Sequence, residues 1–138
     1  MEKKWFTLEE ANAILPIIRQ EINQLQSIKR EFEKSFMRLR QVKEHTGKIR
    51  EGQPDLYFTL ESELEFMQIE ARTLVQSIHM KGAQLKDLDM GLVDFPSLRD
   101  GEEVLLCWRL GEEKIAHWHG LNDGYLGRKL IEENGWPE

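Results

Sequence analysis

The chain has little cysteine and no long apolar segment. It contains one Cys in 138 residues, which excludes an internal disulfide framework and any cysteine-based zinc site. No apolar run approaches the ~20 residues that a membrane-spanning helix needs. The start, MEKKWFTLEE, lacks the apolar core of a secretory signal peptide. We therefore expect a cytoplasmic protein in a reducing compartment, with no membrane partner.

Positive charge is also scarce. The chain has 19 Lys and Arg against 25 Asp and Glu, a formal net charge of −6. Contacts to phosphates usually require a basic face, so this net negative charge argues against a nucleic-acid partner. With 40% hydrophobic and 32% charged residues, the composition is that of a globular protein, and we expect residues 1–138 to form a single domain.

The first long helix is predicted over residues 8–45. Thr7 and Glu10 have the spacing of a capping box, which satisfies backbone donors at a helix start. Pro16 removes one backbone donor, and we expect a bend there because the apolar pattern continues past it. That pattern has apolar residues three and four positions apart, typical of one helix face: Leu8, Ala11, Leu15, Ile18, Ile22, Leu25, Phe32, Phe36 and Leu39.

A second helix is predicted over residues 55–82, after a loop rich in Gly and Pro. Asp55 is its expected N-cap and Gly82 its expected end. The same apolar spacing predicts a long antiparallel two-helix hairpin. Residues 29–51 hold eight Lys or Arg against four acids, while residues 55–70 hold five acids and no base. In a hairpin these two segments lie side by side and offset each other's charge.

Helix 1 carries more apolar residues than one face needs. Ile14, Ile17 and Ile28 form a second set, concentrated toward the start of the helix. This set predicts either the surface on which the C-terminal stretch docks or a helix contact between subunits.

Residues 84–128 change to short runs separated by turn residues, which predict a small, mainly antiparallel sheet of three or four strands. Together with the hairpin this gives an α+β fold. The clearest strand is residues 104–110, and residues 115–119 follow as its partner. A loop of two or four residues sets three expected pairs: Leu110 with Ile115, Trp108 with His117, and Leu106 with His119.

This register predicts which side chains share a face of the sheet. His117 and His119 lie on one face, and Cys107 and Arg109 lie on the other. A loop with an odd number of residues would break the register. Both faces carry large apolar groups, so we expect the helices to cover one face and the tail or a second subunit to cover the other.

Two kinds of site are possible on this sheet. His117 and His119 could begin a divalent metal site, with a third ligand from Asp94 or another nearby carboxylate. Asp94, Arg109 and Arg128 could instead bind a small anionic ligand, because an arginine on an apolar strand needs a partner.

No catalytic set can be assigned from the sequence, and no cofactor beyond a possible divalent metal is predicted. Asp94 and Glu103 are the protein partners expected for Arg109. Cys107 is expected to be a small core residue rather than an activated thiolate.

Four segments of the sequence are similar to one known family. They are FTLEEANAILP at 6–16, KDLDMGLVDFP at 86–96, LCWRLGE at 106–112, and HWH with GYLGR at 117–128. The chain resembles the uncharacterised bacterial family called domain of unknown function 2203, some of whose members carry labels linked to division initiation. The resemblance implies a compact bacterial protein and supplies no activity.

Two functions are therefore carried forward. The first is a non-enzymatic interaction or assembly protein that homo-oligomerises through its helices, as coiled coils do. The alternative is a domain that binds a small anionic ligand or a metal at a site on the C-terminal sheet. Catalysis is a third hypothesis, and it has less support than these two because no nucleophile or acid–base pair can be named.

Overall fold

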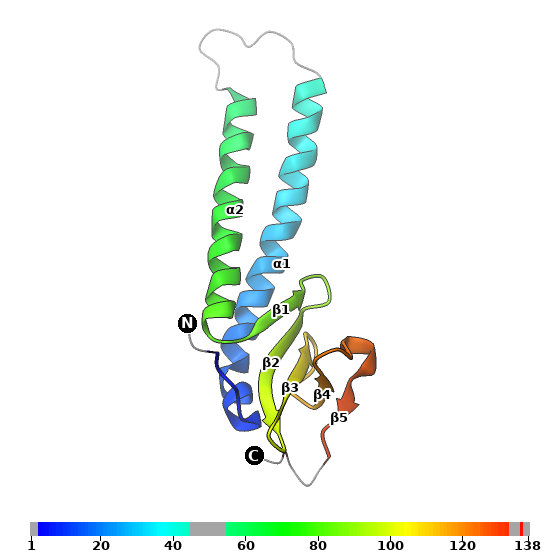
Figure 1. The fold of residues 1–138 in the computed structure, drawn as a ribbon. Helices are drawn as coiled ribbons and strands as arrows, with labels where there is room; N and C mark the ends of the chain where they lie inside the picture. Colours follow the sequence, from blue (N-terminus) through cyan, green and yellow to red (C-terminus); the bar gives the residue numbers. More distant parts are fainter. Residues whose placement is uncertain (1–2, 45–54, 133–135, 137–138) are drawn as a thin grey trace.

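The computed structural model describes residues 3–44, 55–132 and 136. Two helices are followed by a five-stranded antiparallel sheet in the order β1-β2-β3-β4-β5, which confirms the predicted α+β fold (Figure 1). The elements are α1 (Leu8–Glu44), α2 (Leu56–Met80), β1 (Gln84–Asp87), β2 (Leu92–Arg99), β3 (Glu102–Arg109), β4 (His117–Gly120), the 3-10 turn η1 (Tyr125–Gly127) and β5 (Lys129–Leu130). The expected loop between the helices lies outside the described residues.

Both helices begin at the predicted caps. The hydroxyl of Thr7 accepts a hydrogen bond from the Glu10 backbone N–H, and the Glu10 carboxylate accepts one from Thr7 N–H, each at 3.0 Å. Asp55 accepts a hydrogen bond from the backbone N–H of Phe58. The helix α1 continues through Pro16, as the apolar pattern predicted.

The hairpin is covered by the sheet only near its open end. In α1 the buried apolar residues stop at Leu25, although the helix continues to Glu44. Of the second apolar set, Ile14 packs partly against the core and Ile28 is half-buried, whereas Ile17 is half exposed. None of the helices in the described part of the chain is long and apolar enough to cross a membrane.

A partly buried ion pair joins the two helices at this end. Glu21 of α1 accepts a hydrogen bond from the ammonium of Lys81, just after α2, at 2.9 Å. Lys81 also donates to the hydroxyl of Ser77 at 2.7 Å. A carboxylate in this apolar region is therefore paired, as burial of charge requires.

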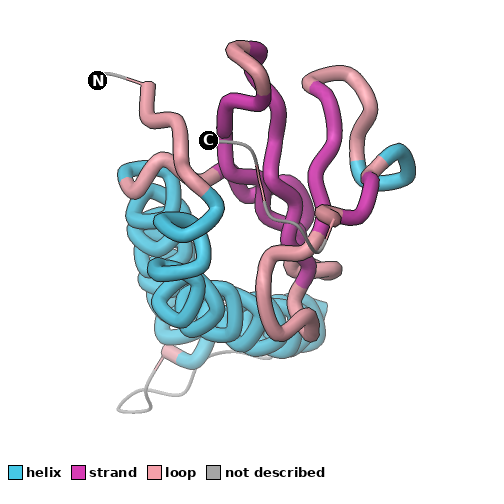
Figure 2. The backbone as a smooth tube through the Cα atoms, turned by 90° about the horizontal axis from the view of Figure 1, so that it is seen from below, coloured by secondary structure: helices cyan, strands magenta, loops and turns pink. Residues whose placement is uncertain are grey.

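Both helices lie on one side of the sheet (Figure 2). Alternate residues of the two central strands face them, including Val93 and Phe95 of β2 and Leu106 and Trp108 of β3. These side chains form one core with the start of α1. The indole N–H of Trp108 donates to the Glu112 carbonyl at 2.9 Å, so this large buried side chain has no unsatisfied donor.

The N-terminal segment is hydrogen-bonded to β2. The Phe6 N–H donates to the Pro96 carbonyl, and the Ser97 hydroxyl donates to the Phe6 carbonyl, both at 2.6 Å. Trp136, near the other end of the chain, donates to the Ser97 hydroxyl at 3.3 Å. Residues from both ends of the chain therefore meet at Ser97.

The register between β3 and β4 is shifted by one residue from the predicted register. Leu105 faces His119 and Cys107 faces His117, so the predicted pairs of Trp108 with His117 and Leu106 with His119 were wrong. Seven residues, 110–116, separate the two strands, and this odd number is the reason. A shift of one residue moves every side chain to the other face, so both histidines share a face with Cys107.

Candidate functional site

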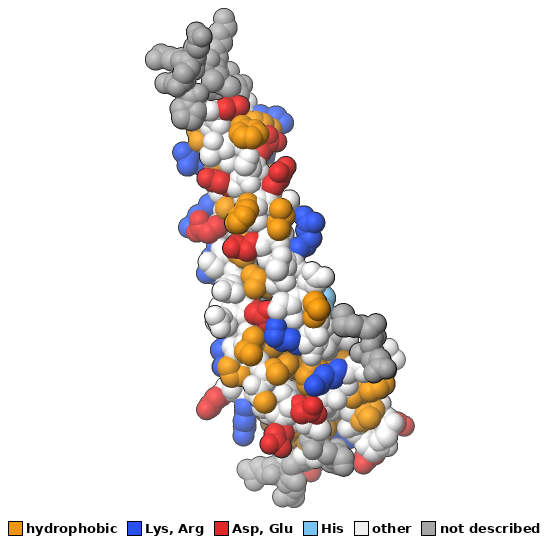
Figure 3. Space-filling model, turned by 90° about the vertical axis from the view of Figure 1, so that its left-hand side faces the viewer, with side chains coloured by type: hydrophobic (Ala, Val, Ile, Leu, Met, Phe, Trp, Pro, Cys, Tyr) orange, Lys and Arg blue, Asp and Glu red, His pale blue; other side chains and the backbone are white. Residues whose placement is uncertain are grey.

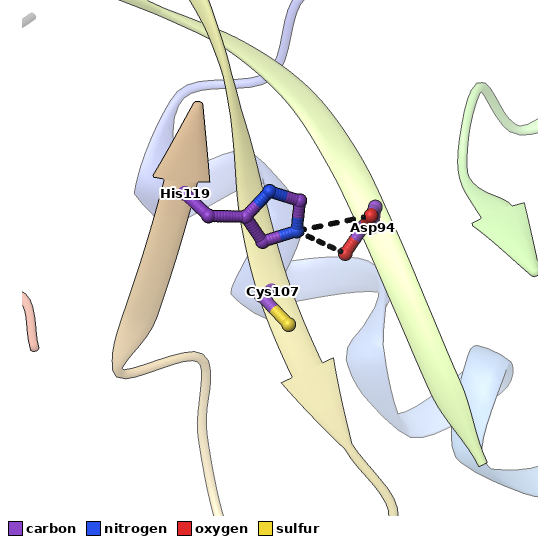
Figure 4. Close-up of side chains that lie close together, drawn as sticks. All are labelled: Asp94, Cys107 and His119. Atoms are coloured by element: carbon purple, nitrogen blue, oxygen red, sulfur yellow. Dashed lines mark hydrogen bonds and ion pairs between the residues drawn. The ribbon is translucent and has the colours of Figure 1, made fainter. Parts of the chain in front are cut away.

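Three potential metal ligands meet on the face of the sheet that points away from the helices. Asp94 comes from β2, Cys107 from β3 and His119 from β4. One ligand atom from each lies within 4.8 Å of the other two, and all three residues are buried. The imidazole of His119 extends across β3 to the Asp94 carboxylate, with the Cys107 thiol beside them (Figure 4).

Strand pairing explains why these residues converge. Asp94 is directly opposite Cys107 across the β2–β3 ladder. Leu105 is opposite His119 across the β3–β4 ladder, so His119 is a diagonal neighbour of Cys107. Residues opposite or diagonal on one face are within reach of each other's side chains.

Both ring nitrogens of His119 face oxygen atoms. Nδ1 lies 2.8 Å from the Gly120 carbonyl oxygen, and a carbonyl can only accept, so Nδ1 carries a proton. Nε2 lies 3.2 Å from each oxygen of the Asp94 carboxylate. A lone pair on Nε2 and an ionised carboxylate would repel each other, and a cation between them would turn this repulsion into attraction. Such a cation is either a proton or a metal ion.

The thiol of Cys107 is fully buried. Burial, with the negative charge of Asp94 added to it, raises the pKa of the thiol from 9.0 to about 12, although the Arg128 guanidinium beside it acts in the opposite direction. The metal-free protein therefore holds a neutral thiol at physiological pH. A metal ion is the usual means by which a protein deprotonates such a group.

Arg128 lies beside the Cys107 thiol and also binds Glu112. Its guanidinium donates two hydrogen bonds to the Glu112 carboxylate, at 3.0 and 2.9 Å. Burial raises the pKa of Glu112, but hydrogen bonds from Arg128 and from the Arg109 backbone N–H lower it, and the net pKa is below the ordinary value. Nδ1 of His117 lies 3.4 Å from the same carboxylate, without a hydrogen bond.

The three residues offer ligand atoms of the kinds that zinc binds. Zinc binds Asp or Glu oxygen, His nitrogen and Cys sulfur at about 2.0–2.3 Å, which places two ligand atoms roughly 3.3–3.8 Å apart. Nε2 of His119 and the Asp94 oxygens, 3.2 Å apart, are already about this close. The Cys107 sulfur lies within 4.8 Å of both and would move toward them on metal binding. The Nδ1–H of His119 already donates to a backbone carbonyl, the outer contact that metal-bound histidines commonly make.

Comparison with known proteins adds a family to this description. A family model described as "Uncharacterized conserved protein (DUF2203)" matches residues 4–131. The chain belongs to this family. Searches of curated proteins and of solved structures found no match. Membership of the DUF2203 family confirms the resemblance drawn from the sequence and leaves the function to be argued from the site.

In this DUF2203 protein, only some of the residues predicted for the metal site and the anion site lie together. Asp94 and His119 lie together, while His117 is turned toward Glu112. Arg109 is exposed, and it donates to the Tyr125 hydroxyl at 3.0 Å. The expectation that Asp94 or Glu103 pairs with Arg109 was wrong.

Glu103 has other partners than Arg109, and Arg109 contacts Tyr125 instead. Glu103 accepts a hydrogen bond from the indole of Trp5 and pairs with Lys3. Arg109 and Arg128 both stack on the ring of Tyr125, at 5.8 and 4.5 Å from its centroid. Each arginine therefore has a partner within the chain, the Tyr125 hydroxyl for Arg109 and the Glu112 carboxylate for Arg128.

Cys107 is the residue that sequence reasoning placed correctly in the interior but left out of the site. A single cysteine excludes a zinc site built on several thiolates, but a mixed set needs only one. The predicted register put Cys107 on the opposite face from His119, and the true register reverses this.

Alkaline pH should destabilise the metal-free protein through Cys107. The folded chain keeps the thiol proton up to about pH 12, whereas the unfolded chain loses it above about pH 9. Between these values, unfolding releases a proton, so the free energy of unfolding should fall by about 1.4 kcal/mol per pH unit from this group.

Urea unfolding of the wild type and Cys107→Ala at about pH 8 and about pH 10.5 measures this effect. The other titrating groups are the same in both proteins. The difference between the two proteins in how far the free energy of unfolding falls from the lower to the higher pH therefore comes from the thiol. An equal fall in both proteins would contradict a buried neutral thiol.

Proposed function

We propose that this protein binds one divalent transition-metal ion, of the zinc class, through Asp94, Cys107 and His119. The observation that carries the proposal is the contact of His119 Nε2 with both oxygens of the Asp94 carboxylate, 3.2 Å each, next to the only thiol of the chain. One nitrogen, one sulfur and one carboxylate oxygen favour zinc or a similar ion over calcium or magnesium, which prefer oxygen ligands alone.

The burial of the site favours a role in holding the sheet together. Asp94 and His119 are 3% exposed and Cys107 is 0% exposed, so a substrate has little direct access to the ligands. The three residues come from three neighbouring strands, and an ion bound to them joins β2, β3 and β4. We place this function in the cytoplasm, where a thiol ligand stays reduced.

Metal binding can be tested with the purified chain. Elemental analysis after exchange into zinc should give about one ion per chain, and the melting temperature should rise with added zinc because only the folded chain holds the three ligands together. Cobalt should give a thiolate charge-transfer absorption, which reports on Cys107 itself. Binding should strengthen by at least about tenfold for each pH unit, because the thiol proton is released on binding, and by more if a proton between His119 and Asp94 is displaced too.

Three variants identify the ligands. Cys107→Ser and His119→Gln should each weaken zinc binding by at least about 100-fold, since each removes one of three ligands. His117→Gln is the matched control and should bind zinc like the wild type. If the control also loses zinc, the ion is held by the two histidines together; if the wild type binds no zinc, the proposal is wrong.

We propose a second function, self-association through the helical hairpin. The supporting observation is that α2 exposes several large apolar side chains, among them Phe58, Phe66 and Ile69. Surfaces of this kind on a soluble helix usually contact another protein. Light scattering over a range of concentrations tests the proposal, and a monomer at the highest concentration would contradict it.

A further inference from the structure

The outer face of α2 carries a regular row of side chains. Its positions are three or four residues apart, which keeps them on one stripe of a helix: Phe58, Ser62, Phe66, Ile69, Thr73, Gln76 and Met80. The four large apolar members are between 57% and 68% exposed. Figure 3 looks onto the hairpin from the side of α2 and shows hydrophobic side chains spaced along its length.

This row is separate from the face that α2 turns toward α1. Leu60 and Ile78 are buried against the rest of the chain. Ile69 is nine residues from each, and at about 100° per residue this places it on the opposite side of the helix. The α2 helix is therefore apolar on two faces, and its own chain covers only one of them.

A groove runs beside the row. It has a volume of about 470 Å³ and lies between α1 and α2. Phe66, Ile69 and Leu74 line it from α2, and Ile28 lines it from α1. Such a hollow next to exposed aromatic and aliphatic side chains can receive the side chains of a second helix.

We propose that a second copy of this chain docks on the outer row of α2, with the two α2 helices antiparallel. This inference rests on the proposed self-association and adds the surface and the orientation. Residues 55–70 hold five acids and no base. Residues 71–81 hold no acid and carry the positive charges of Arg72 and Lys81, of which Lys81 is already paired with Glu21 of its own chain. Antiparallel helices place the acidic half of each α2 against the basic half of the other, whereas parallel helices place acid against acid.

The shape of the chain agrees with this orientation. The sheet lies at one end of the hairpin, on the side away from the outer face of α2 (Figure 1). An α2 of 25 residues is roughly 37 Å long. Two antiparallel copies place their sheets at opposite ends of the shared helices, where they leave the outer row open for contact.

The surface is tested by sedimentation of the full chain in buffer with a chelator, which removes any dependence on metal. The wild type should have about twice the chain mass of 16.3 kDa. The double variant Phe66→Glu/Ile69→Glu should dissociate at least about 100-fold more readily, because two buried charges oppose the contact. Met37→Glu is the matched control, since Met37 of α1 is 54% exposed and outside the row.

Oxidative cross-linking tests the orientation. In antiparallel helices two copies of residue 58 are roughly 33 Å apart, because 22 residues separate positions 58 and 80 at about 1.5 Å each. Phe58→Cys alone should therefore give no cross-linked dimer, whereas a mixture of Phe58→Cys and Met80→Cys chains should give one. Wild-type chain, which contains only the buried Cys107, is the control for oxidation.

The outcomes separate the inference from the function on which it rests. A monomeric wild type at every concentration overturns both. A dimer that survives Phe66→Glu/Ile69→Glu keeps self-association and overturns the proposed surface. A cross-linked dimer from Phe58→Cys alone keeps the surface and overturns the antiparallel orientation. Circular dichroism of each variant confirms that the fold is retained.

Discussion

Asp94→Val should lower the free energy of unfolding of the metal-free protein by about 3–5 kcal/mol. The carboxylate is 3% exposed and both of its oxygens contact His119. Removing one member of a buried pair leaves the other without a partner in an apolar interior, which is the costly case. Valine has the branched shape that strands accept, so the loss comes from the missing charge and hydrogen bond rather than from the backbone.

The double variant Asp94→Val/His119→Leu is the control for this prediction. Replacing both members of a buried pair with apolar groups of similar volume is often neutral or stabilising. We therefore expect the double variant to be more stable than Asp94→Val alone, although neither binds metal. Urea unfolding with a chelator measures both. If the double variant is no more stable than Asp94→Val, Asp94 and His119 are not coupled and the site has been described wrongly.

Trp108→Ala should cost about 3–5 kcal/mol, the range for deleting a large buried aromatic side chain. Trp108 is 0% exposed, and it packs between the sheet and α1, where the Arg19 guanidinium lies 5.7 Å from the ring centroid. The change also removes the donor to the Glu112 carbonyl. Trp108 therefore reports on whether the helices cover this face of β3.

Trp5→Ala is the matched control, because Trp5 is 46% exposed. Its loss should change the free energy of unfolding by less than about 1 kcal/mol. The difference between the two tryptophan variants then measures what the buried Trp108 side chain contributes to the free energy of unfolding. If Trp108→Ala costs no more than Trp5→Ala, the helices do not cover the face assigned to them.

The helical part of the fold was predictable because its signals are local. A capping box at Thr7 and Glu10 and an aspartate before α2 act within one turn. The apolar spacing then gives the length of each helix and one face of contact. The fifth strand was missed because Lys129–Leu130 is too short to show an alternating pattern.

The site was only half predictable. The sequence suggested a metal site begun by His117 and His119, with Asp94 as a possible third ligand. The structure brings Asp94 and His119 together, while His117 is turned toward Glu112. The partner of a strand depends on the length of the connection, and the signal at 111–114 suggested an even loop where the chain uses seven residues. One residue of register decides whether Cys107 belongs to the site.

The sequence did not predict the outer row of α2, for a different reason. Two apolar stripes on one helix share the same period, and the stripe that faces α1 explains the pattern by itself. Only the exposed fractions of Phe58, Phe66, Ile69 and Met80 show that a second stripe exists. Of the surplus residues of α1, which the sequence suggested for docking of the C-terminal stretch or for a subunit contact, only Ile14 packs against the core, while Ile17 stays 50% exposed.

A hydrogen bond between α1 and the segment before β4 joins parts of the chain that are synthesised at different times. Asn12 in α1 accepts a hydrogen bond from the backbone N–H of Ile115, 103 residues later. At about 5–20 residues per second, the ribosome adds those residues in roughly 5–20 s. During that interval the apolar face of α1 exists without the strands that will cover it. The newborn chain therefore depends on its helices staying soluble until β3 and β4 emerge, and slower translation lengthens the period in which a chaperone can bind.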